Sequence, residues 1–87
     1  MAEVAAAADW YAERGLELDR AFLDEVSRVL GHVRTSPGRY GVIEGDIRRA
    51  VLRRFPYMIL FRALEHEVVV LACFHGRRDP DEWRTRI

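Results

Sequence analysis

The hydrophobic pattern changes its period near Tyr40, and this change limits the fold classes that the chain can adopt. Up to about residue 34, apolar residues recur at the three- and four-residue spacing of amphipathic helices. After Tyr40 come three short runs rich in β-branched and aromatic residues, "IRRAVLRR", "YMILFRAL" and "EVVVLACFH". Helices followed by strands predict a single α+β domain over residues 1–87.

The first half of the chain predicts two helices, over residues 2–14 and 17–34. The first segment is rich in alanine and is followed by Gly15, a typical residue at a helix end. The second carries an apolar stripe that includes Phe22 and Val26. Because the link between them is short, we expect an antiparallel helical hairpin.

The second half predicts three strands, over residues 47–54, 57–64 and 67–75. Their short connections favour antiparallel pairing, with the helical hairpin covering one face of the sheet.

The segment "FHGRRDPDEW" begins at the end of the last predicted strand and has a high density of polar, charged and aromatic side chains. We interpret Phe74 as the last core residue of that strand and Gly76 as a turn. Asp79 and Pro80 are suited to open a short C-terminal helical turn, and Trp83 to anchor this turn on the domain.

Composition limits the classes of function. The chain has 14 arginines and no lysine, and its formal net charge is zero. Residues 1–46 carry a net charge of −4 and residues 47–87 a net charge of +4. The basic half suits an acidic protein partner, a nucleic acid or a phosphate, but the overall balance argues against a general nucleic-acid binder.

Membrane insertion, disulfides, metals and cofactors are not expected. The apolar run at residues 68–74 is far shorter than the roughly 20 residues of a membrane span, so we expect a cytoplasmic protein. Cys73 is the single cysteine and is interpreted as a buried thiol. The histidines His32, His66 and His75 are too scattered to predict a metal site.

Arginines on the predicted strands are candidates for binding. In strands, side chains alternate between faces, so Arg49 and Arg53 are expected on one face and Arg48 and Arg54 on the other. These arginines, with Arg62 on the next strand, form either a solvated surface or an anion-binding face.

His75 stands beside two further arginines, Arg77 and Arg78. A histidine among cations suits general acid–base catalysis of RNA cleavage. It also suits a histidine that only forms hydrogen bonds at a strand end, and the sequence leaves both interpretations open.

The segments "AADWYAERG.EL..AFLDEV..VL", "SPGRYGVIEGDIRRAVLRRFPYMILFR" and "EVVVLACFHGRRDPDEW" together resemble the RelE/ParE superfamily of toxins. These toxins belong to bacterial type II toxin–antitoxin modules, and the motifs "RR.PY.I.FR" and "V.VLA..HGRRDP..W" favour the ParE-like, plasmid-stabilisation branch. The resemblance implies a helical hairpin packed on an antiparallel sheet. It also implies a cognate antitoxin whose C-terminal segment wraps and neutralises the toxin.

The superfamily implies two alternative activities. ParE-like members bind DNA gyrase and need no nuclease site, whereas RelE-like members are endoribonucleases that cut mRNA in the ribosome. We favour the ParE-like activity, because lysine and a C-terminal tyrosine are absent and because a net charge of zero does not favour binding to ribosomal RNA. A toxin fold without toxicity, held by an antitoxin, is a third possibility. The candidates for target binding are Arg48, Arg53, Arg54, His75, Arg77, Arg78 and Trp83, and those for a ribonuclease are His75, Arg78, Arg54 and Arg62.

The chain departs from the family pattern at its start. Family members usually open with a short strand, whereas Met1 to Glu3 lead directly into the helical pattern. Without that strand we expect a bare sheet edge, which invites a partner strand, a dimer or aggregation.

Overall fold

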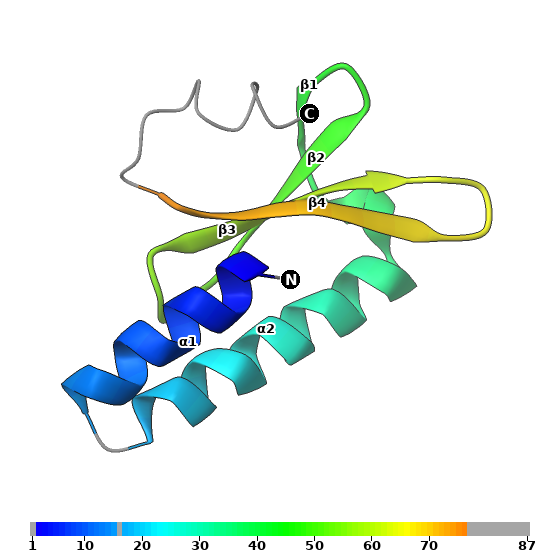
Figure 1. Cartoon of the computed structure of the whole chain (residues 1–87). Coiled ribbons are helices and arrows are strands. Elements are labelled where there is room, and N and C mark those ends of the chain that lie inside the picture. The colour runs from blue at the N-terminus through cyan, green and yellow to red at the C-terminus, as the bar shows by residue number, and fades with distance from the viewer. Residues whose placement is uncertain (1, 16, 77–87) are drawn as a thin grey trace.

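The computed structural model describes residues 2–15 and 17–76, and it confirms the α+β class (Figure 1). Two helices come first and pack against one face of an antiparallel sheet. The elements in chain order are α1 (Ala2–Arg14), α2 (Leu18–Thr35), the 3-10 helix η1 (Pro37–Arg39), β1 (Val42–Glu44), β2 (Ile47–Val51), β3 (Tyr57–Ala63) and β4 (Val68–His75). The proposed C-terminal helical turn lies outside the described residues.

The helical hairpin forms as expected. The first predicted helix, over residues 2–14, coincides with α1, and α2 lies one residue later than predicted at both ends. Glu17, the residue before α2, adopts a left-handed conformation with a φ of 62°. Gly15 packs closely in this corner, since a Cβ atom there would lie 2.7 Å from Leu18 Cδ1. Neither of the described helices is long and apolar enough to cross a bilayer.

The described sheet has four strands rather than the three predicted, in the consecutive order β1-β2-β3-β4. The additional strand, β1, pairs with β2 through a two-residue turn, in which Gly45 has a φ of +57°. Glycine adopts this left-handed conformation without steric cost.

The prediction that the first arginine-rich strand reaches residue 54 is wrong at its end. β2 stops at Val51, and Arg53 and Arg54 lie in the connection between β2 and β3. The alternation of strand faces therefore does not apply to these two arginines, and the predicted pairing of Arg49 with Arg53 on one face is lost.

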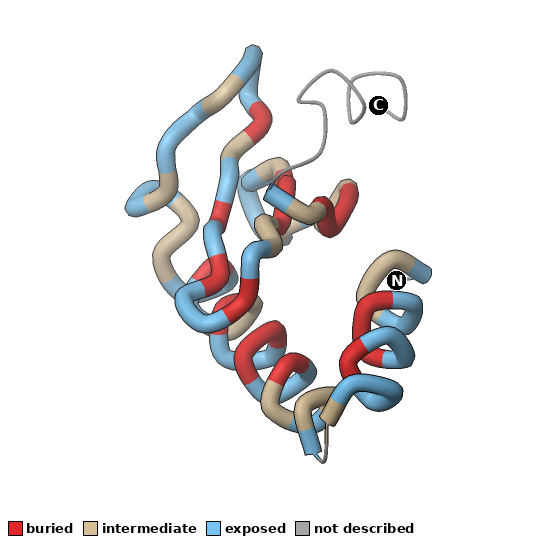
Figure 2. Tube along the Cα trace, turned by 90° about the vertical axis from the view of Figure 1, so that its left-hand side faces the viewer, coloured by how far each residue is buried: buried red, intermediate tan, exposed pale blue. Residues whose placement is uncertain are grey.

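The main core lies between the helices and the sheet (Figure 2). The side chains of Phe22 and Val33 from α2 are fully buried there, as are those of Ile59 and Phe61 from β3. Tyr11, Phe22, Phe55 and Tyr57 form a ring cluster with centroid distances from 4.9 to 6.3 Å. The prediction of a buried Cys73 is also confirmed, since it belongs to this core.

A second apolar cluster occupies the opposite face of the sheet. Its buried members Ile47, Leu60, Ala72 and Phe74 all come from strands. Leu60 lies between Ile59 and Phe61 in the sequence, and side chains alternate along a strand, so this face points away from the helices. Phe74 is therefore a core residue as predicted, but it packs on the far side of the sheet from α1 and α2.

Candidate functional site

The connection between β2 and β3 meets the end of β4 at one end of the sheet. The backbone N–H of Gly76 donates a hydrogen bond to the carbonyl of Pro56, with 2.6 Å between the heavy atoms. Tyr57 faces His75 in the strand ladder, and their rings lie 5.2 Å apart between centroids. The segments "RRFPY" and "CFHG", separate in the sequence, are thus neighbours in the structure.

An aromatic cleft opens beside this junction. It has a volume of about 400 Å³ and is lined by Trp10, Tyr11, Pro56, Tyr57 and His75. The Trp10 side chain contributes an indole to the surface, since this residue is 49% exposed. The Arg14 guanidinium carbon lies 3.7 Å from the centroid of that indole, a cation–π distance.

Two of the arginines that the sequence singled out have structural roles. Arg48 Nη1 donates a hydrogen bond of 2.6 Å to the carbonyl of Tyr40, which fixes the approach of the chain to β1. Arg62 Nε donates to Asp46 Oδ1 at 2.9 Å and forms an exposed ion pair with it. Exposed pairs of this kind contribute little to stability.

Arg54 links the β2–β3 connection to the helices through its backbone. Its N–H donates to Glu25 Oε2 at 3.0 Å, which ties the β2–β3 connection to α2. Glu25 is only 7% exposed, although glutamate is rarely buried. Sequence reasoning missed this role of Glu25, because its partner is a backbone group 29 residues away.

Two of the described ribonuclease candidates, Arg62 and His75, lie far apart. Arg62 lies two residues after Leu60 on the face away from the helices, whereas His75 lies two residues after Cys73 on the helix face. They also stand at opposite ends of the sheet, since His75 faces Tyr57, five residues before Arg62. At the usual rise of a strand, this separation along β3 is roughly 17 Å.

The remaining candidates, Arg77, Arg78 and Trp83, lie outside the described residues. The interpretation of Trp83 as an anchor stays a prediction. Among the described residues, no group of three side chains is placed to hold a metal ion.

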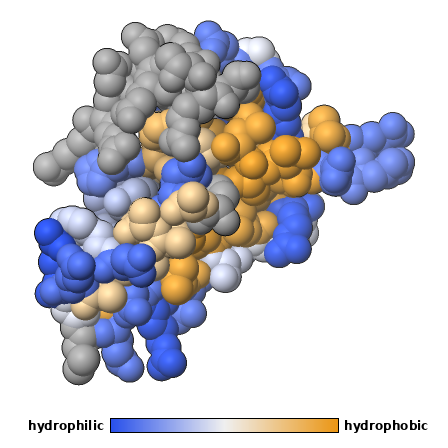
Figure 3. All heavy atoms as spheres, in the orientation of Figure 1, coloured by the Kyte–Doolittle hydropathy of each residue, from blue (hydrophilic) through white to orange (hydrophobic). Residues whose placement is uncertain are grey.

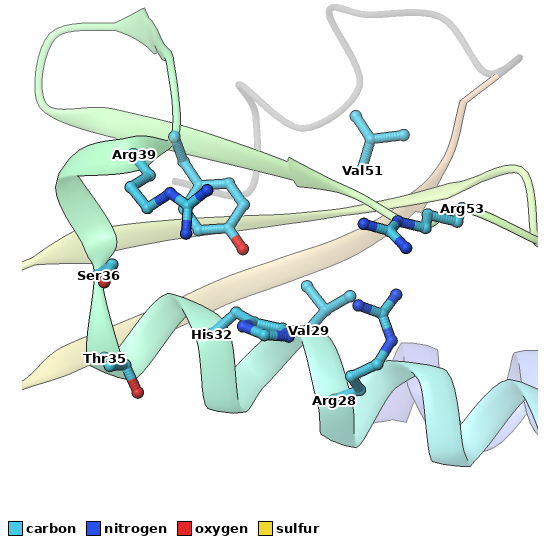
Figure 4. A pocket seen from close by; sticks show the side chains of 9 residues that line it. Arg28, Val29, His32, Thr35, Ser36, Arg39, Val51 and Arg53 are labelled. Atoms are coloured by element: carbon cyan, nitrogen blue, oxygen red, sulfur yellow. The ribbon is translucent and has the colours of Figure 1, made fainter.

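A second cleft was missed by the sequence analysis and is called the arginine cleft below (Figure 4). Its volume is about 530 Å³, and it is lined by the basic side chains of Arg28 and His32 from α2, Arg39 from η1 and Arg53 from the β2–β3 connection. The sequence did contain one indication of this cleft: Arg28 and His32 are four residues apart and therefore share one face of α2. Nothing in the sequence indicated that this face would meet Arg39 and Arg53.

Burial shifts the pKa values of two core groups. It raises the pKa of the Cys73 thiol to about 11, with a smaller contribution from the Glu3 carboxylate. It also raises the pKa of the Tyr11 phenol, with a smaller contribution from Tyr57. A thiol that stays protonated at neutral pH is a poor nucleophile and a poor metal ligand.

Comparison of the chain with protein-family models, curated proteins and solved structures finds no match in any of the three.

Proposed function

We propose that this chain is the toxin component of a bacterial type II toxin–antitoxin module, of the ParE-like kind, which inhibits growth by binding DNA gyrase. The observation that best supports the proposal is the junction of Pro56 with Gly76 and of Tyr57 with His75. In this junction the two segments that carry the resemblance to these toxins lie side by side. They belong to a sheet that packs against a helical hairpin of the expected type.

The aromatic cleft is the proposed surface for the target. Tryptophan, tyrosine and arginine are the residues that most often dominate protein–protein binding energy. All three are present here, as exposed Trp10 with Arg14 stacked on it and Tyr57 in the cleft beside them. The positions of His75 and Arg62 on opposite faces favour a binding protein over a ribonuclease of the RelE type.

The proposed site for the antitoxin is the outer edge of β4. In the described part of the chain, β4 has one neighbouring strand, β3, so it lies at the edge of the sheet. Residues 68–74 are all apolar, and Figure 3 shows apolar residues gathered along this edge. An antitoxin segment that adds a strand here would gain backbone hydrogen bonds and cover apolar surface. Both proposed partners place the protein in the cytoplasm.

Induction of the chain in a bacterial host tests the proposal. We expect growth to stop, with loss of negative supercoiling and accumulation of DNA breaks that depend on gyrase. Trp10→Ala should weaken this toxicity at least about tenfold, because it removes the exposed anchor of the cleft. Arg20→Ala is the matched control, since Arg20 is an exposed helix residue that pairs with Glu17 away from the cleft.

A second pair of variants separates the two activities. We expect His75→Ala to reduce gyrase inhibition modestly and His66→Ala, in an exposed turn, to have no effect. If mRNA is cut in translating ribosomes and His75→Ala abolishes that cutting, the chain is a RelE-type ribonuclease and the gyrase proposal is wrong. Normal growth on induction, with folded protein present, contradicts both activities.

A further inference from the structure

The arginine cleft lies apart from the aromatic cleft, and the described residues that line the two are all different. Three parts of the chain contribute its basic side chains: α2, η1 and the β2–β3 connection. Figure 4 shows the guanidinium groups of Arg28 and Arg53 near each other across the gap between α2 and the end of β2, with His32 farther along the same helix.

Among the residues that the structure describes, none that lines this cleft is acidic. Within residues 2–15 and 17–76, the side chains of Arg28, Arg39 and Arg53 form no ion pair. By contrast, Arg14, Arg20 and Arg62 each pair with a carboxylate. Like charges gathered without a counter-charge repel one another, and a bound anion removes that repulsion.

We propose that the arginine cleft binds the phosphate group of a nucleotide. Guanidinium groups match phosphate oxygens in a bidentate geometry, and two or more of them can share one phosphate. A phosphate monoester carries close to two negative charges, which suits several convergent cations better than the single charge of a carboxylate does.

The size and the remaining walls of the cleft fit more than a phosphate alone. A volume of about 530 Å³ lies within the usual range for small-molecule sites. Buried Val29, exposed Val51 and the Tyr40 side chain add apolar surface beside the cations. A nucleoside attached to the phosphate would contact this surface.

The phosphate can come from a free nucleotide or from a single strand of nucleic acid. Both present the same group to the arginines, but a strand also carries further phosphates that extend beyond the cleft. The proposal does not depend on gyrase binding, because it uses none of the described residues of the aromatic cleft.

Titration of the full chain with adenosine monophosphate, inorganic phosphate and a short oligothymidylate tests the proposal. Backbone amide signals in an NMR spectrum identify the binding site. We expect both organic ligands to shift the signals of residues 28–40 and 51–54, with inorganic phosphate binding more weakly. Arg28→Gln and Arg53→Gln should each weaken binding roughly tenfold or more. Arg20→Gln removes the same charge from the same helix and should leave the affinity unchanged.

The relative affinities identify the source of the phosphate. Adenosine monophosphate binding as tightly as the oligothymidylate supports a free nucleotide, and clearly tighter binding of the oligothymidylate supports a nucleic-acid strand. The proposal is overturned if no ligand shifts these signals. Equal weakening by Arg20→Gln also overturns it. A glutamate-rich peptide is titrated in the same way, and the proposal is overturned if this peptide binds as tightly as the nucleotide.

Discussion

At the residue scale, the properties of Cys73 follow from its surroundings. The thiol belongs to a strand, β4, and to the core between this strand and the helices. Burial there disfavours the thiolate, so the native thiol holds its proton more tightly than an exposed one. The sequence predicted burial from the apolar run, but only the packing decides how strongly the pKa is raised.

We expect Cys73 to resist alkylation in the native protein. At pH 8 its pKa of about 11 leaves on the order of one thiolate in a thousand, whereas the ordinary pKa of this thiol in an unfolded chain is 9.0. Labelling by iodoacetamide should therefore be slow in buffer and fast in denaturing urea. The native rate should rise with pH until about pH 11.

The same shift predicts the effect of pH on stability. Because the folded pKa is higher than the unfolded value, the stabilisation from this group is complete below pH 9 and is lost as pH rises through about 11. Fast labelling of the native chain at pH 8, without unfolding, would contradict the buried position of the thiol.

At the element scale, Glu25 joins the helical hairpin to the sheet. Its carboxylate accepts the backbone N–H of Arg54, which belongs to the connection between β2 and β3. The bond holds the region where Phe55 and Tyr57 enter the core. A connection that carries both a cleft residue, Arg53, and part of the aromatic junction is thereby fixed against α2.

We expect Glu25→Ala to lower the free energy of unfolding by about 1 to 3 kcal/mol, because it leaves the Arg54 N–H partly buried without its partner. Glu25→Gln keeps an acceptor oxygen and should cost less. Urea denaturation measures both changes, and hydrogen exchange at the Arg54 amide should quicken in the alanine variant. Glu13→Ala, at an exposed position on α1, is the control and should change stability by less than about 0.5 kcal/mol.

Equal losses for the glutamine and alanine variants would contradict a role through hydrogen bonding. In that case the negative charge of Glu25, rather than its acceptor oxygen, would stabilise the connection.

The sequence contains a signal for the hairpin of β1 and β2 that the strand prediction did not use. Gly45 and Asp46 stand between two β-branched runs, and such a glycine-aspartate pair is a typical hairpin turn. The three-residue strand before it was too short to show an alternating pattern. Only its pairing with β2 defines it as a strand.

At the scale of the whole molecule, the helices and the sheet depend on one core. Phe22 of α2 touches the ring cluster that includes Phe55 and Tyr57, so neither half of the chain buries its apolar face alone. A domain of this size has a total stability of roughly 4 to 13 kcal/mol. The helices and the sheet should therefore unfold together.

We expect the loss of helical circular dichroism to coincide, in a urea titration, with the loss of the native NMR signals of the β3 and β4 amides. Phe22→Ala removes a fully buried ring and should lower stability by about 3 to 5 kcal/mol, a large part of the total. Leu23→Ala, at a position 41% exposed on the same helix, is the matched control and should cost much less. Two separate transitions in the native chain would mean that the hairpin and the sheet are independent units.

The sequence by itself determined the two helices, the three longer strands and the burial of Cys73 and Phe74. Each of these depends on local periodicity or on an apolar run, which neighbouring residues encode directly. The arginine cleft, the Glu25 bond and the separation of His75 from Arg62 were decided by the tertiary structure. They depend on which faces of distant elements pack together and on where a strand ends. The pattern of side chains within one element encodes neither of these.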